Sequence, residues 1–205
     1  MKKFSLFLLA IIIISMSAGC SGREGRAAEA RELVRGSWNG NIFTSEFAGL
    51  TFTMPDNWLP GSDEEIAALM GVSAEFLSEQ GMKITEKMLE LSTIYDMAAQ
   101  NPINGDSIIL MFENLSMHIG GTRLNEMQYL ESLAEQLDSF EMGYAFLGIK
   151  DTTIAGQSFK TLEASIDMYG LIQFYHVRKI DNFMCAIIVT IDQGNDNLIS
   201  RFSGL

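Results

Sequence analysis

The stretch WNGNIFTSEFAGLTFTMPDNW, residues 38–58, decides the fold that this sequence predicts. Residues 41–47 include isoleucine, threonine and two phenylalanines, which are types that suit a pleated surface. Residues 50–54 alternate apolar side chains with threonine, which is typical of a half-buried strand. Gly49 separates the two segments, and Pro55 ends the second one. We therefore expect a β-hairpin at the start of the folded domain.

Trp58 follows the turn after this hairpin, where an indole can serve two purposes. It can line a groove that receives a ligand or a partner. It can also close one end of the sheet as a hydrophobic plug, with its ring N–H at the rim. The plug is the favoured interpretation, and Trp58 stays a candidate for a partner or ligand surface.

A pattern of aromatic, glycine and proline residues in this stretch resembles the opening hairpin of the PsbP-like family. The residues that carry it are Phe43, Phe47, Gly49, Leu50, Phe52, Pro55 and Trp58. The rest of the chain agrees with that family in the order of its elements. The resemblance implies an antiparallel sheet with helices on both faces, an α/β/α sandwich. It also implies a domain that serves mostly for protein contacts and is not tied to an enzymatic activity.

Residues 1–19 have the features of a lipoprotein signal peptide. A basic start is followed by an apolar run over residues 4–14 and by small residues before Cys20. The ending resembles the lipobox of bacterial lipoproteins, in which a cysteine receives a diacylglyceryl group and becomes the first mature residue. Ser17 stands where that motif usually has leucine, so ordinary cleavage after Ala18 or Gly19 stays an alternative. The apolar run is shorter than the roughly 20 residues that span a bilayer, which disfavours an uncleaved anchor.

Composition and charge fit one globular domain held outside the cytoplasm by lipid. We expect residues 20–37 to form a tether and residues 38–205 to form a single domain, with a core supplied by 47% hydrophobic residues. The net charge of −12 repels nucleic acid and anionic lipid, so palmitate-type chains on Cys20 would hold the protein at the membrane. With Cys20 lipidated, Cys185 has no disulfide partner, and its apolar surroundings indicate a buried free thiol.

Hydrophobic periodicity predicts hairpins with helices inserted between them. Helices are expected over residues 62–71, 73–81, 83–91 and 122–140, with a short last helix from 193 to about 202. Strands are expected over residues 92–99, 108–112, 144–149, 158–166, 171–179 and 183–191. The last strand is apolar almost throughout and should be the most buried. This order favours an α+β fold, an antiparallel sheet flanked by helices, over a doubly wound parallel one.

No catalytic, metal or cofactor motif stands out, so we expect no cofactor and no enzymatic activity. A zinc site needs three or four ligands, and the only histidines, His118 and His176, share no ligand spacing. Arg123 follows two glycines at a predicted helix start, where it can hold an anion, although glycines there also serve simply as a connection. With Trp58, these three residues are the candidates for a partner or ligand surface.

The favoured function is a lipid-anchored extracytoplasmic binding or scaffolding domain that contacts another envelope protein. The contact would use a sheet edge or an exposed apolar groove near Trp58. One alternative is a small-ligand carrier with a deep apolar cavity. Another is an enzyme in which His118, His176 and carboxylates share a pocket.

Lipid anchoring predicts that Cys20→Ala releases the protein from the membrane into the medium or periplasm, because the acyl chains are lost. Cell fractionation with immunodetection measures this. Cys185→Ala is the matched control and should stay in the membrane fraction. Persistent membrane retention of the Cys20→Ala variant would contradict the anchor.

Overall fold

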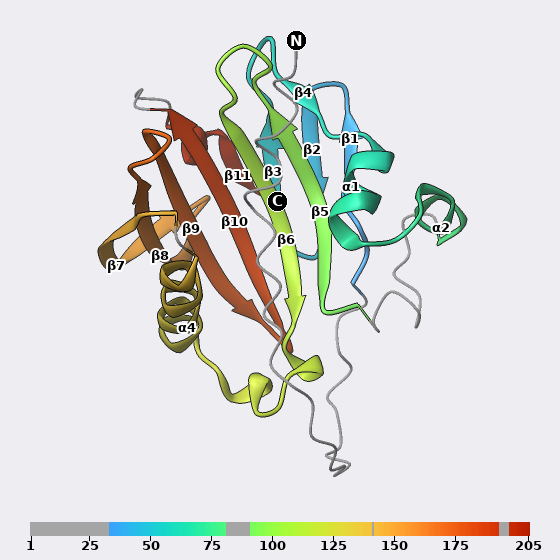
Figure 1. Ribbon diagram of the computed structural model, residues 1–205. Helices are drawn as coiled ribbons and strands as arrows, with labels where there is room; N and C mark the ends of the chain where they lie inside the picture. The colour runs from blue at the N-terminus through green and yellow to red at the C-terminus, as the bar shows by residue number, and fades with distance from the viewer. Residues whose placement is uncertain (1–32, 81–90, 141, 193–196) are drawn as a thin grey trace.

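The computed structural model describes residues 33–80, 91–140, 142–192 and 197–205 (Figure 1). A four-stranded sheet has the order β1 (Ser37–Asn39), β2 (Ile42–Ser45), β3 (Leu50–Thr53) and β11 (Phe202–Gly204). A seven-stranded sheet has the order β4 (Leu59–Pro60), β5 (Thr93–Gln100), β6 (Ser107–Asn114), β10 (Phe183–Asp192), β9 (Leu171–Ile180), β8 (Gln157–Ile166) and β7 (Tyr144–Ile154). Every strand pair is antiparallel. The predicted α+β class, an antiparallel sheet flanked by helices, is confirmed.

The two sheets form layers. In Figure 1 the helices α1 (Asp63–Met70) and α4 (Glu126–Ser139) lie in front of the seven-stranded sheet, and the four-stranded sheet lies behind it. Phe47, in the turn between β2 and β3, joins the layers. Its ring centroid lies 5.1 Å from that of Phe112 on β6 and 5.6 Å from that of Phe183 on β10, both edge-on. The main core therefore lies between the sheets, and α4 packs on the opposite face over β7, β8 and β9.

The predicted hairpin at residues 41–54 is confirmed. Phe43 of β2 pairs with Phe52 of β3, both side chains are buried, and Gly49 takes the positive φ that the turn needs. The third strand partner is not foreseen by the sequence. Phe202 of β11 pairs with Phe52, so the chain ends as a strand where a helix up to residue 202 was predicted. Only the 3₁₀ turn Leu198–Arg201 is helical there, and residues 193–196 lie outside the described part.

The first two predicted helices are confirmed with their caps. The Ser62 hydroxyl accepts the N–H of Glu65, whose carboxylate accepts the N–H of Ser62, which is a complete capping box. The helix α2 (Ala74–Gln80) starts after Ser73, whose hydroxyl accepts the N–H of Phe76. The signal peptide, most of the tether and residues 83–90 of the third predicted helix lie outside the described residues. Within the described part, no helix has the length and apolar character to cross a bilayer.

The helix α4 begins later than predicted. Asn125, and not Thr122, caps it, because the Asn125 and Gln128 side chains each accept the other's backbone N–H. Residues 121–123 form a separate 3₁₀ turn, and the Thr122 carbonyl accepts a hydrogen bond from the Lys179 ammonium. The helix therefore starts at the reciprocal capping box of Asn125 and Gln128, while Thr122 is held in the preceding turn by its bond to Lys179 of β9.

A buried strand is predicted well from its apolar residues, whereas an exposed polar strand is not. The strand β10 is buried from Phe183 to Ile191, as predicted, and Cys185 within it is a buried free thiol. By contrast β7 is longer than predicted, because its polar second half, Lys150–Thr153, pairs with β8 although it lies largely in solvent. The packed domain also begins early: Leu33, inside the range predicted as tether, is buried in the core.

Candidate functional site

The residues singled out by the sequence do not converge. Trp58 is only 5% exposed and so contributes no open surface, in agreement with the plug interpretation. Arg123 lies exposed on the 3₁₀ turn Gly121–Arg123. His176 is buried on β9, with its Nδ1 2.7 Å from the Thr161 hydroxyl. Burial, with a smaller effect of the Lys150 charge, lowers the pKa of His176 to about 4, so the imidazole is neutral at pH 7.

The two histidines lie on opposite faces of the seven-stranded sheet. Alternation along β9 turns His176 away from the face of Tyr175 and Val177, which meet α4. His118 instead lies beside Glu113, whose carboxylate accepts a hydrogen bond from Tyr129 of α4, so it is on the α4 face. Within the described residues no group of three or more histidine, cysteine or acidic side chains is placed to hold a metal ion. The structure therefore brings no shared histidine pocket together.

Glu113 is a buried acid that the sequence analysis did not single out. Tyr129 donates a hydrogen bond of 2.6 Å to its Oε2, which fastens α4 to β6. His118 Nε2 lies 3.0 Å from its Oε1, without the alignment of a hydrogen bond. Burial raises the pKa of Glu113 to about 7, against the opposing effect of the Tyr129 hydrogen bond. Burial and the Glu113 charge together raise the pKa of Tyr95 to about 12.

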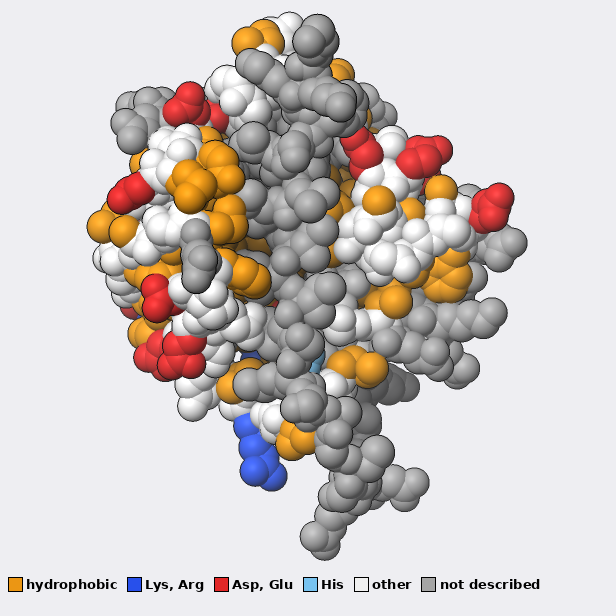
Figure 2. Space-filling view, in the orientation of Figure 1, with side chains coloured by type: hydrophobic (Ala, Val, Ile, Leu, Met, Phe, Trp, Pro, Cys, Tyr) orange, Lys and Arg blue, Asp and Glu red, His pale blue; other side chains and the backbone are white. Residues whose placement is uncertain are grey.

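An open groove lies between α4 and β7. It measures about 510 Å³, and apolar side chains dominate its lining. Figure 2 shows hydrophobic side chains gathered on the α4 and β7 side of this face, with acidic side chains beside them. The lining residues are Met127, Glu131, Ala134 and Glu135 of α4, and Phe146, Gly148, Ile149 and Leu162 of β7 and β8.

The strand β7 forms the outer wall of this groove and the edge of the sheet. Among the described strands it neighbours β8 alone, so one side of its backbone carries hydrogen-bonding groups that none of them meets. A bulge interrupts the register between Phe146 and Ile149, with Gly148 at a φ of 95°. Leu147, in the bulge, is 70% exposed. An unpaired edge thus adjoins an apolar groove.

The charged side chains that line the groove are all acidic. Glu131 and Glu135 line it, and within the described residues no ion pair joins either to a basic side chain. The nearby lysines are engaged elsewhere: Lys150 pairs with Glu163 at 2.9 Å, and Lys160 pairs with Asp151 at 2.6 Å. The groove therefore presents uncompensated negative charge.

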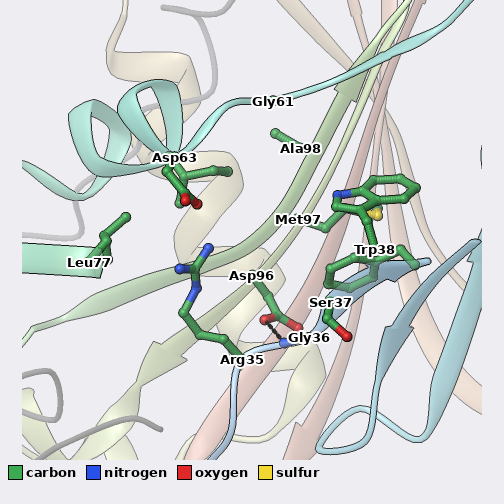
Figure 3. Close-up of a pocket in the computed structure, with 12 residues that line it drawn as sticks. Arg35, Gly36, Ser37, Trp38, Gly61, Asp63, Leu77, Asp96, Met97 and Ala98 are labelled. Carbon is green, nitrogen blue, oxygen red and sulfur yellow. Dashed lines mark hydrogen bonds between the residues drawn. The ribbon is translucent and has the colours of Figure 1, made fainter. Parts of the chain in front are cut away.

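A second hollow lies between β1, β5 and α1 (Figure 3). It measures about 360 Å³. Asp96 of β5 is buried at its base, where it accepts hydrogen bonds from the Gly36 N–H at 2.6 Å and from the Ser45 hydroxyl at 2.7 Å. Burial raises the pKa of Asp96 to about 6, against the opposing effects of these bonds and of the nearby Arg35 charge. Asp96 thus ties the chain before β1 to the large sheet.

No family model matches the chain, and no curated protein sequence matches it. Among solved structures, the fold is similar to the solution structure of cyanobacterial PsbP (CyanoP) from Synechocystis sp. PCC 6803. The two share 10% sequence identity at a TM-score of 0.45, and the similarity covers 88% of this chain and 98% of that one. At this identity the likeness concerns the fold alone.

The pKa of Glu113 predicts a stability change with pH. Its folded value of about 7 lies above the ordinary 4.5, so its contribution to stability is complete below pH 4.5 and is lost as pH rises to about 7. Glu113→Gln removes this titration. The free energy of unfolding of the unmodified protein should therefore fall relative to Glu113→Gln by about 3 kcal/mol across that window.

Urea unfolding followed by circular dichroism at a series of pH values measures this difference. Glu46→Gln, at an exposed acid, is the control and should track the unmodified protein at every pH. Parallel pH profiles for the unmodified protein and Glu113→Gln would contradict the buried titration.

Proposed function

We propose that this chain is a lipid-anchored extracytoplasmic binding domain, and that its α4–β7 groove receives an extended segment of another envelope protein. The observation that carries the proposal is the open edge of β7 beside an apolar groove. The anchor is supported by the lipobox-like ending at Cys20. Such a domain would work close to the membrane, on proteins that share the same surface.

An extended segment is the partner shape that fits this edge. Backbone N–H and C=O groups on the outer side of β7 need water or another strand, and adding a strand to a sheet edge is a common mode of peptide recognition. Side chains of an added strand alternate between two faces. One set would enter the groove against Phe146, while the other set points to solvent.

The bulge restricts where such a segment pairs. Beyond it, Lys150 and Asp151 place charges along the strand, and charged edges discourage nonspecific strand pairing. Before it, Tyr144 stacks on Phe146 with parallel rings, and Leu147 is exposed. The segment therefore pairs with residues 144–147, and the charged half keeps the edge from self-association.

Charge selects the chemistry of the segment. Glu131 and Glu135 attract basic side chains to the α4 wall, and the net charge of −12 steers a cationic partner toward the molecule. We expect a segment with alternating apolar residues and with lysine or arginine near its ends. Binding should weaken as salt concentration rises.

Site-specific photo-crosslinking in intact cells tests the proposal. A photoreactive amino acid at position 147 should form an adduct with an extended, basic and apolar segment, identified by mass spectrometry of the linked peptide. Position 103 is the control, because Ile103 is similarly exposed at 75% but lies in the β5–β6 turn. Adducts that form equally at both positions, or that map to a folded surface of the partner, would overturn the groove assignment.

Charge reversal within the groove sharpens the test. The double change Glu131→Lys and Glu135→Lys, made in the chain that carries the photoreactive group, should reduce the adduct at position 147 by about tenfold or more. Glu46→Lys alters net charge on an exposed site away from the groove and should leave the adduct unchanged. Equal loss in both variants would point to general charge repulsion.

A further inference from the structure

We propose that the hollow between β1, β5 and α1 binds a small zwitterion of the α-amino-acid type with an apolar side chain. Its carboxylate would lie on Arg35 and its ammonium group on Asp63. This ligand site is separate from the α4–β7 groove and goes beyond the proposed partner binding. It rests on an arginine aimed into a cavity, on the charges around it and on an aromatic wall.

Arg35 supplies the anion-binding group. Figure 3 shows its guanidinium rising into the hollow between Asp63 of α1 and Asp96 of β5. The Nε–H is buried and has no hydrogen-bond partner among the described residues. A buried donor without a partner is costly, and the guanidinium end of the same side chain points into the hollow, where a ligand oxygen can reach its terminal N–H groups. The planar fork of N–H groups matches a carboxylate in particular.

The acids around Arg35 restrict what that ligand can be. Both Asp96 oxygens already accept a hydrogen bond, one from Gly36 and one from Ser45. Within the described residues, no Asp96 or Asp63 oxygen lies within ion-pair distance of the Arg35 guanidinium. One guanidinium beside two carboxylates leaves the hollow with net negative charge at pH 7, which excludes polyanions. A ligand with one carboxylate and one ammonium group matches these charges.

The rest of the hollow has apolar side chains beside polar groups, and its size is suitable. The Trp38 ring packs against Phe43 at a centroid distance of 5.2 Å and forms one wall. Ile66, Leu77 and Met97 add apolar surface, and Ser37 adds a polar side chain. A volume of about 360 Å³ lies at the lower end of small-molecule sites, which accommodates an amino acid with a branched or aromatic side chain.

Tryptophan fluorescence of the full chain in detergent tests this site. Trp38 and Trp58 are the only tryptophans, so Trp58→Phe leaves Trp38 in the pocket wall as the sole reporter. Titration with L-leucine should give a saturable change in emission. Arg35→Gln should weaken binding by at least about tenfold, because charge-assisted hydrogen bonds to the carboxylate are lost. Arg123→Gln, which removes an exposed arginine, should have no effect.

Ligand analogues separate the two ends of the zwitterion. Isocaproate keeps the carboxylate and isoamylamine keeps the amine, and each should bind more weakly than leucine. Asp63→Asn, at an exposed position of the first helical turn, should weaken leucine binding but leave isocaproate binding unchanged. Calorimetric titration of the unmodified chain provides an independent readout.

Three results would overturn the site. The first is the absence of a saturable signal with leucine, phenylalanine or methionine up to about 10 mM. The second is equal leucine affinity in the Arg35→Gln and unmodified chains, with circular dichroism showing both folded. The third is tighter binding of inorganic phosphate than of any amino acid.

Discussion

Apolar contact between the two sheets is the constraint on which the rest of the structure depends. Phe47 leaves the β2–β3 turn and enters between Phe112 and Phe183, and burial of one such ring contributes about 1.5–3 kcal/mol. Arg178 reinforces the contact, since its guanidinium donates to the Ala48 carbonyl at 2.7 Å and lies over the Phe159 ring. With one face of the large sheet taken in this way, α4 packs on the other face, and the outer edge of β7 remains unpaired by any described strand.

Local signals in the sequence predict most of the elements but few of their long-range partners. Alternation over residues 50–54, the capping box from Ser62 and the apolar run of β10 each act over a few residues, and each is confirmed. The pairing of β11 with β3 joins residues about as far apart as the domain allows, and no local pattern encodes it. The polar half of β7 was missed because hydrogen bonding to β8, and not burial, makes it a strand.

The candidate sites could not be predicted from local patterns either, because their residues come from distant parts of the chain. His118, Arg123 and His176 attracted attention as residue types, yet their neighbours come from different faces of the sheet. Arg35 lies within the predicted tether, and Asp96 lies within a predicted strand where no local pattern marks it. Only the crossing of the chain before β1 over β5 brings them together, through the Asp96 bond to Gly36. The groove similarly exists because α4 lies along a strand that follows it after a short connection.

Hydrogen exchange along β7 in the purified full chain tests the central claim, an open edge ready for a partner strand, most directly. Alternate amides of residues 144–146, the part of β7 proposed to pair with the partner, face β8 and should exchange slowly, whereas the amides between them face solvent and should exchange rapidly. Amide-resolved nuclear magnetic resonance distinguishes the two sets. Uniform protection of every amide in this segment would show that the edge is already covered, and would contradict the account.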